Sequence, residues 1–292
     1  MSFSTDLKRE IAELKLSGKG RRARLKGMLL YSKEADKKDV LFSSSHAFLC
    51  EILQRDCAHL LPEASVQLEQ EQRGRKVNYL VTAPEQQKTA LFAMLGADDR
   101  FYQEPALGEL LGGIFLACGT MTDPKKAYLL EFSCRSNRRA DALCELLRER
   151  GIFATATTRQ GQPLVYVKDS ESVEDTVTLM GAVKTSFEIM NIKIYKDIRN
   201  KANRITNCET ANIEKTVAAA ARQTQAIHFL ISEKGEDFLT PELKQAAQLR
   251  LDNPEASLSE LLAAADFPVS RSGLNHRLNR LCLLADRLKE KH

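Results

Sequence analysis

Apolar and small residues concentrate at residues 111–120, a stretch that ends in Gly-Thr. Gly113 and Ala117 are four positions apart, so on a helix they share one face that carries no bulky side chain. Such a face lets a second helix approach closely. Residues 25–33 begin with the same Leu-x-Gly step, 86 positions before residue 111, and its glycine is Gly27. We therefore predict that two helices pack side by side about a pseudo-twofold axis.

The hydrophobic patterns that follow these two stretches predict the same order of elements. Each copy continues with a strand, a helix, two strands joined by a polar turn, and a closing helix. The first copy covers residues 40–42, 46–58, 65–71, 76–81 and 84–95, and the second covers 128–134, 136–150, 152–158, 164–168 and 172–180. The predicted fold is a pseudo-twofold αβαββα repeat. Two unrelated α/β stretches that share Leu-x-Gly by chance are the alternative.

The rest of the chain has helical periodicity. Residues 185–205 and 211–232 each predict a helix, and Thr240-Pro241 is a typical start for a further helix that ends at Leu251. We place a domain boundary near Asn207. The predicted domains are therefore residues 1–200 and residues 207–292.

The last two predicted helices have the helix-turn-helix pattern. Ser257 and Glu260 have the capping-box spacing at the start of the first helix, and a short turn at residues 266–269 follows it. Ser270 is placed to cap the second helix, whose leucines recur with helical spacing on one side. The other side carries polar and basic residues, namely Arg271, Ser272, Asn275, His276, Arg277, Asn279 and Arg280.

This polar side is the predicted DNA-binding site. A recognition helix enters the major groove with its N-terminal residues nearest the bases, so we assign base contacts to Arg271 and Asn275. Arg277 and Arg280 lie further along the helix, and we assign them phosphate contacts. A helical hairpin with a solvated basic face is the alternative.

The distribution of basic residues adds two further segments as candidates for DNA contacts. The net charge is only +4, but residues 1–38 hold 11 Lys and Arg against 5 Asp and Glu. Basic segments favour polyanions, although a solvated surface is the more common interpretation. The additional candidates are Arg21, Arg22, Arg24, Lys26, Arg199, Lys201 and Arg204.

Other residue types argue against a metal centre or a cofactor. The 7 cysteines include no C-x-x-C pair, and the 5 histidines fall in different elements. No P-loop or G-x-G-x-x-G occurs, so we predict no cofactor and no metal. The scattered cysteines and the lack of an apolar run of ~20 residues predict a reduced, cytoplasmic protein that does not enter the membrane. Because it is predicted to bind DNA, we expect it to associate with the nucleoid.

Three stretches carry a more specific pattern: Ser-Phe-Ser-Thr-Asp-Leu-Lys at residues 2–8, Phe-Leu-Ala-Cys-Gly-Thr at residues 115–120, and residues 201–215. They resemble the WhiA family of bacterial sporulation and cell-division regulators. The two Leu-x-Gly helices resemble the LAGLIDADG motif pair of homing endonucleases. The resemblance covers essentially the full length. It implies an α+β fold, with a LAGLIDADG-like repeat domain followed by an all-α helix-turn-helix domain.

The resemblance also identifies what is missing for catalysis. In the homing endonucleases, the eighth position of each motif is a carboxylate that holds divalent metal ions. Those positions are Ser32 and Cys118 in this sequence, and the nearest carboxylates, Glu34 and Asp123, lie beyond the motifs. We therefore expect a nuclease fold without catalytic residues. A metal-dependent endonuclease with relocated acids is the alternative.

These observations predict a sequence-specific transcriptional regulator that binds double-stranded DNA. A role in sporulation or cell division is what the resemblance implies. A scaffold that acts on cell division through protein contacts is a further alternative, and a protein partner in transcription regulation stays open. The sequence also leaves open the oligomeric state and whether the N-terminal domain binds DNA, a protein or a small ligand.

Overall fold

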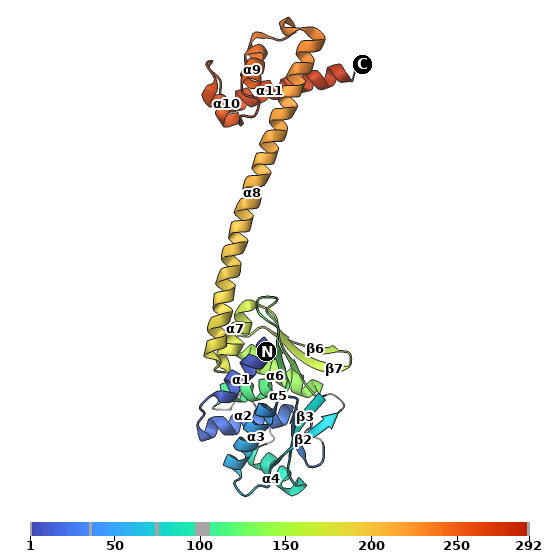
Figure 1. The fold of residues 1–292 in the computed structure, drawn as a ribbon, viewed down its shortest axis with the longest axis vertical. Coiled ribbons are helices and arrows are strands. Elements are labelled where there is room, and N and C mark those ends of the chain that lie inside the picture. The colour runs from blue at the N-terminus through green and yellow to red at the C-terminus, as the bar shows by residue number, and fades with distance from the viewer. Residues whose placement is uncertain (1, 35–36, 74–75, 97–105, 291–292) are drawn as a thin grey trace. The chain divides into compact units, whose positions relative to one another are not determined.

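The computed structural model of the chain describes residues 2–34, 37–73, 76–96 and 106–290. These residues form two compact units, residues 1–196 and residues 197–292, which we call the N-terminal and C-terminal units. The N-terminal unit holds two antiparallel sheets and most of the helices (Figure 1). Each unit has its own hydrophobic core, so each is described by itself.

The N-terminal unit repeats one arrangement of elements twice. Before the second motif helix lie α1 (Phe3–Glu13), α2 (Gly18–Tyr31), β1 (Val40–Ser44), α3 (Ala47–Leu60), β2 (Gln67–Arg73), β3 (Lys76–Thr82) and α4 (Glu85–Leu95). From that helix onward lie α5 (Leu107–Cys118), β4 (Gly119–Met121), β5 (Leu130–Ser133), α6 (Asn137–Glu149), β6 (Ala154–Arg159), β7 (Gln162–Val167) and α7 (Ser170–Leu179). The predicted order of elements in the two copies is confirmed, and in the described part of the chain the short strand β4 is an addition to the second copy.

The sheets show that the repeat is also topological. The first sheet has the order β1-β3-β2, and the second has the order β4-β5-β7-β6. In the first sheet β3 lies between β2 and β1, and in the second sheet β7 lies between β6 and β5. All of these strand pairs are antiparallel. The sequence predicts the polar turn at residues 70–75, but residues 70–73 pair with β3 as part of β2, and residues 74–75 lie outside the described residues. The topology supports the repeat over two unrelated α/β stretches.

The two motif helices, α2 and α5, pack with almost no space between their backbones. A Cβ atom built on Gly113 would lie 2.0 Å from the backbone oxygen of Arg24, and one built on Gly27 would lie 2.3 Å from the backbone oxygen of Leu110. No side chain fits at such a separation, so both positions require glycine. Ala117, on the same face as Gly113 by spacing, is half-buried against the core. The predicted helix pair is therefore present.

Helix α8 (Val183–Lys234) differs from the prediction, because it is one helix of 52 residues. It runs through Asn207, where the sequence predicts a break, and Figure 1 shows it without interruption. The segment contains neither glycine nor proline. Asn and Thr cost a helix only some tenths of a kcal/mol each, up to about 0.7, which is too little to end it. The division of the chain into two compact units falls within this helix, between Lys196 and Asp197.

The C-terminal unit packs the last part of α8 against three shorter helices and one 3₁₀ turn. These are the 3₁₀ turn at Glu236–Phe238, α9 (Pro241–Asp252), α10 (Leu258–Ala264) and α11 (Arg271–Lys289). Its core contains Ile227 and Leu230 from α8, Leu243 from α9 and Leu261 from α10. One side of α11 completes this core, which leaves the opposite side of α11 to solvent.

Candidate nucleic-acid interface

Local hydrogen bonds fix where α10 and α11 begin. The Ser257 hydroxyl accepts the N–H of Glu260 at 3.3 Å, and the Glu260 carboxylate accepts the N–H of Ser257 at 2.7 Å. This is the predicted capping box. The Ser270 hydroxyl accepts the N–H of Gly273 at 3.1 Å and caps α11 as predicted. The helix-turn-helix is thus bounded by side chains that satisfy otherwise unpaired N–H groups.

The inner side of α11 is fixed by a column of leucines. Leu274, Leu278 and Leu281 are each 0% exposed, and Ala285 continues the column. Burying a leucine contributes about 1.5–3 kcal/mol relative to exposure, so these side chains hold the helix in one rotation about its axis. That rotation decides which residues face solvent.

The outer side of α11 presents most of the predicted DNA-binding residues. Those that are exposed are Ser270, Arg271, Ser272, Asn275, His276, Asn279 and Arg280. Arg271 and Asn275 lie one turn apart at the N-terminal end, as predicted. The face combines a guanidinium, an amide and hydroxyls, which are the groups that read base edges in the major groove.

Arg277 is the exception among the predicted contacts. It is half-buried, and its guanidinium carbon lies 5.6 Å from the centroid of the Phe267 ring. A cation over an aromatic face is attracted to it, by about 0.5–1 kcal/mol at exposed sites. The residue therefore also holds the turn before α11 against the helix.

A buried arginine that the sequence analysis missed positions the helix-turn-helix. Arg250, near the end of α9, is 3% exposed, and burial lowers the pKa of its guanidinium. Its Nε donates to the side-chain oxygen of Gln223 on α8 at 3.0 Å, and its Nη1 donates to the backbone oxygens of Ala256 at 2.7 Å and Asn253 at 3.2 Å. One side chain thus ties the α9–α10 connection to α8. No local sequence signal marks such a residue.

We expect Arg250→Met to loosen this connection. The substitution leaves two backbone carbonyls and an amide without their donor, at a cost of about 1–3 kcal/mol. The amides of α10 and α11 should exchange hydrogen faster in the full-length chain. Lys244→Met on the same helix is the control, because Lys244 is half-buried and pairs with the surface carboxylates of Glu236 and Asp237. Unchanged exchange in Arg250→Met would contradict the role of Arg250.

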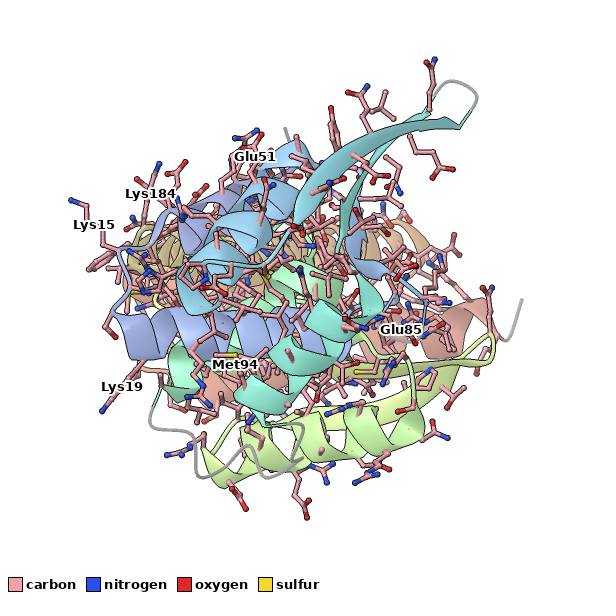
Figure 2. All side chains as sticks on the ribbon, turned by 90° about the horizontal axis from the view of Figure 1, so that it is seen from below. Lys15, Lys19, Glu51, Glu85, Met94 and Lys184 are labelled. Carbon is pink, nitrogen blue, oxygen red and sulfur yellow. The ribbon has the colours of Figure 1, made fainter. Side chains whose placement is uncertain are left out.

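The basic segment of α2 corrects part of the sequence-based interpretation. Arg24 is 1% exposed and Lys26 is 6% exposed, so neither side chain is available to DNA. Arg22 is exposed and donates to the backbone oxygen of Met94, and Arg21 is half-buried. Two further cations nearby reach solvent. Lys15, before α2, and Lys19, in its first turn, project from the surface (Figure 2).

Arg24 is a structural residue. Its Nε donates to Oδ2 of Asp56 at 2.8 Å and its Nη2 to Oδ1 at 3.0 Å, while its Nη1 donates to the backbone oxygen of Ala12 at 3.2 Å. Burial lowers the pKa of Arg24 and raises the pKa of Asp56. The pair joins α1, α2 and α3 inside the core. Removing one partner of such a pair typically costs about 3–5 kcal/mol, since the other charge stays buried.

The basic residues of α8 are accessible to solvent, in contrast to the buried Arg24 and Lys26 of α2. Arg199, Lys201 and Arg204 are all exposed, as a DNA contact requires. They belong to the C-terminal unit, upstream of its helical core. They stay candidates for phosphate contacts.

The ends of the two motif helices hold the positions that carry acids in the homing endonucleases. Ser32 is 1% exposed, and its hydroxyl accepts the N–H of Glu34 at 3.1 Å. Cys118 is 6% exposed, and its thiol donates to the backbone oxygen of Ile114 at 3.4 Å. A hydrogen bond with Cys134, together with burial, raises the pKa of the Cys118 thiol well above its usual value. Both positions are therefore uncharged.

Cations lie beside this helix end. The Lys8 ammonium donates to the backbone oxygen of Leu116 at 3.3 Å, and burial lowers the pKa of Lys8 to about 8. Both Lys8 and Lys33 lie close enough to Cys118 to lower the pKa of its thiol. A metal ion there would meet positive charge and a neutral thiol instead of the hard oxygen ligands that Mg²⁺ needs.

The nearest carboxylates have other partners. One Glu34 oxygen accepts the Ser43 hydroxyl at 2.9 Å and the other pairs with Lys37. Asp123 accepts the backbone N–H of Lys125 at 2.9 Å. Among the residues that the structure describes, no group of three or more His, Cys, Asp and Glu side chains is placed to hold a metal ion. Within the same residues, no helix is long and apolar enough to cross a membrane.

Comparison with known proteins extends these observations. Residues 107–199 match the family model of the WhiA LAGLIDADG-like domain, and residues 202–285 match that of the WhiA C-terminal HTH domain. The fold is similar to the crystal structure of full-length WhiA from Thermotoga maritima, at 22% identity and a TM-score of 0.62, covering 98% of this chain and 99% of that one. It is also similar to the N-terminal LAGLIDADG domain of a WhiA protein, at 19% identity and a TM-score of 0.51, covering 62% and 92%.

Two curated relatives bear the name probable cell division protein WhiA. The relative from Thermoanaerobacter pseudethanolicus is 31% identical, covering 100% of this chain and 99% of that protein. The relative from Lachnoclostridium phytofermentans is 42% identical, covering 61% and 57%. The match to the first runs through the LAGLIDADG-like repeat, α8 and the helix-turn-helix alike. The chain described here therefore belongs to the WhiA family.

Proposed function

We propose that this chain is a sequence-specific DNA-binding transcriptional regulator without nuclease activity. The observation that carries the proposal is the outer face of α11. There Arg271 and Asn275 are exposed one turn apart at the N-terminal end of a helix that a leucine column fixes in orientation. Arginine pairs with guanine and asparagine with adenine in the major groove, so this face suits a defined sequence of double-stranded DNA.

The proposal assigns two classes of contact. Arg271 and Asn275 contact bases, with Ser270, Ser272 and His276 beside them. Arg280 and the exposed side chains of Arg199, Lys201 and Arg204 contact phosphates and set the salt dependence. Arg277 contributes to phosphate binding from its place over Phe267. Binding to chromosomal DNA would place the protein at the nucleoid.

Selection from random duplexes tests sequence-specific binding. Full-length protein is mixed with a library of random double-stranded oligonucleotides, and the bound fraction is recovered and amplified over several rounds. We expect the recovered pool to converge on one motif. A pool that stays random, or no retention of duplex DNA at all, would favour a scaffold that acts through protein contacts.

The second part of the proposal is that the LAGLIDADG-like repeat does not cleave DNA. Ser32 and Cys118 supply no charge, and Lys8 and Lys33 place positive charge where metal ions would have to bind. The helix pair therefore holds the fold together and supplies no carboxylate for metal binding at these two positions.

We expect supercoiled plasmid to stay intact when it is incubated with the purified chain and Mg²⁺ or Mn²⁺. The readout is conversion to nicked or linear DNA on a gel. Nicking that copurifies with the protein and disappears in Glu34→Gln or Asp123→Asn would show that relocated acids catalyse cleavage.

The biological process follows from the family. The curated relatives are named as probable cell division proteins, so we propose that the regulated genes act in cell division, with sporulation as the related process. Sequencing of DNA crosslinked to the protein in its host tests this. Bound sites without enrichment upstream of division or sporulation genes would contradict the proposal.

A further inference from the structure

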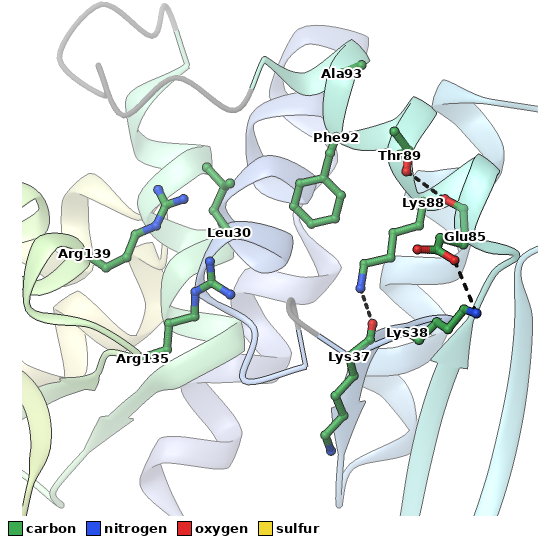
Figure 3. Close-up of a pocket in the computed structure, with 10 residues that line it drawn as sticks. All are labelled: Leu30, Lys37, Lys38, Glu85, Lys88, Thr89, Phe92, Ala93, Arg135 and Arg139. Atoms are coloured by element: carbon green, nitrogen blue, oxygen red, sulfur yellow. Dashed lines mark hydrogen bonds and ion pairs between the residues drawn. The ribbon is translucent and has the colours of Figure 1, made fainter.

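The N-terminal unit contains a basic cavity that DNA reading by α11 does not use. It has a volume of about 710 Å³, within the range of about 300–1,000 Å³ that small-molecule sites occupy. Its walls come from the C-terminal end of α2, the segment before β1, helix α4, and the segment from Arg135 to Arg139 at the start of α6 (Figure 3). It therefore lies between the two halves of the repeat.

The lining of this cavity is strongly positive. Lys37, Lys38, Lys88, Arg135 and Arg139 supply five cations, and Glu85 is the one acidic lining residue, so the formal charge is +4. Lys38 lies 3.6 Å from the Glu85 carboxylate and Lys37 pairs with the Glu34 carboxylate, so two of the five cations are neutralised within the protein. The net charge of the whole chain is also only +4. The formal charge of the lining thus equals that of the whole chain, so the residues outside the lining have a net charge of zero.

The cations come from two opposing sides. In Figure 3 the arginines extend from the α6 side, while Lys37, Lys38 and Lys88 lie on the α4 side. Arg135 directly precedes Ser136, the N-cap of α6, so the N–H groups of the first helical turn add to the positive potential on that side. The backbone of α6 is held in place by the Tyr31 hydroxyl, which donates to the backbone oxygen of Arg139 at 3.0 Å.

An apolar part lies between these two sides. Leu30, which is 4% exposed, and the half-buried Phe92 line the cavity between the arginines and the lysines (Figure 3). A site for inorganic phosphate alone would need no apolar surface. Cations on two sides around an aromatic ring fit a ligand that has both phosphates and a flat organic part.

We propose that this cavity binds a small phosphate-bearing molecule of the nucleoside polyphosphate class. The phosphates lie between Arg135 and Arg139 on one side and Lys88 on the other, and the base or sugar lies against Phe92 and Leu30. Duplex DNA fits less well, because the cavity is concave and of small-molecule size, whereas DNA needs an extended surface. This gives the N-terminal unit a ligand-binding role that is separate from DNA recognition by α11.

Binding of ribonucleoside triphosphates to the full-length chain tests the proposal. Calorimetric titration uses ATP, GTP, CTP and UTP one at a time at physiological salt, with adenosine as the uncharged comparison. We expect at least one triphosphate to bind and adenosine not to bind. Arg135→Gln combined with Arg139→Gln should weaken that binding by about tenfold or more, since charged hydrogen bonds are lost.

A matched variant controls for charge. Lys125→Gln combined with Lys126→Gln also removes two positive charges, from exposed residues of the same unit that do not line the cavity. It should bind the triphosphate within about twofold of the unchanged chain, because exposed charges at a distance are largely screened by salt. Thermal melting of each variant checks that the N-terminal unit is folded.

Three results would overturn the proposal. One is that none of the four triphosphates binds. Another is that Arg135→Gln/Arg139→Gln, while folded, loses no more affinity for the triphosphate than the control variant does. The third is that tripolyphosphate binds as tightly as the best triphosphate, which would make the cavity an unspecific polyanion site. The proposal does not depend on DNA binding, so the triphosphate titration can fail or succeed whatever the duplex selection shows.

Discussion

Gly113→Leu should prevent the N-terminal unit from folding. A Cβ at residue 113 would lie 2.0 Å from the backbone oxygen of Arg24, and backbone cannot move aside as a flexible side chain can. Overpacking a core costs typically about 1–3 kcal/mol, and more where helices must separate. Separation of α2 from α5 would also disturb the buried Arg24–Asp56 pair. We expect the amides of α2 and α5 to lose their hydrogen-exchange protection while α9 and α11 keep theirs.

Two further glycine variants make this expectation quantitative. Gly113→Ala adds only a methyl group, so it should stay partly folded and lose about 3 kcal/mol or more. Gly18→Ala is the control on α2, because its Cβ would lie 3.7 Å from Nε2 of His59, an ordinary contact. We expect it to be neutral or slightly stabilising. Equal stability of Gly113→Ala and Gly18→Ala would show that the helix pair does not pack as described.

Arg271→Ala combined with Asn275→Ala should abolish discrimination among duplexes. Each good base contact supplies about 1–3 kcal/mol, so the double variant should lose about 2–6 kcal/mol on the selected motif and little on random DNA. Fluorescence anisotropy with both duplexes measures the two affinities. If the double variant keeps its affinity and its preference, α11 does not read DNA. DNA binding would then have to be assigned to the exposed residues Arg199, Lys201 and Arg204.

Arg280→Ala should behave differently from the base-contact variants. A lost phosphate contact weakens binding to all duplexes alike and reduces the slope of log affinity against log salt by about one. Arg287→Ala is the matched control, because Arg287 is an exposed arginine four turns from the N-terminal end of α11. It should leave the affinity for duplexes, the salt slope and the sequence preference unchanged. A loss of preference in Arg287→Ala equal to that in the double variant would contradict the orientation proposed for α11.

The sequence by itself was sufficient to predict the repeat and the helix-turn-helix. Gly27 and Gly113 could be recognised because only glycine allows two helix backbones to touch, which leaves a fixed spacing in the chain. Ser257, Glu260 and Ser270 could be recognised because caps act on residues two or three positions away. The outward direction of Arg271 and Asn275 followed from the spacing of the leucines on the opposite side. Each of these features depends on interactions within one element or on one periodic pattern.

Tertiary structure decided what the charged residues do. Arg21, Arg22, Arg24 and Lys26 form one basic run in the sequence, yet Arg24 and Lys26 are buried and Arg22 is exposed. The partner that makes Arg24 structural is Asp56, on another helix. The same holds for Arg250, whose acceptors lie on α8 and in the α9–α10 connection. A charge pattern along the chain cannot show whether a distant segment will supply the partner.

The cavity of the N-terminal unit and the continuity of α8 also required the folded chain. Lys37, Lys88 and Arg135 are far apart in sequence, and they surround one volume only because α4 and α6 come from opposite halves of the repeat. The boundary predicted near Asn207 separated two helical patterns, residues 185–205 and 211–232, whereas the helix continues because no residue there costs enough to end it. Local patterns therefore determined the elements and their outward faces. Burial and the assembly of sites depended on contacts between segments that are distant in the sequence.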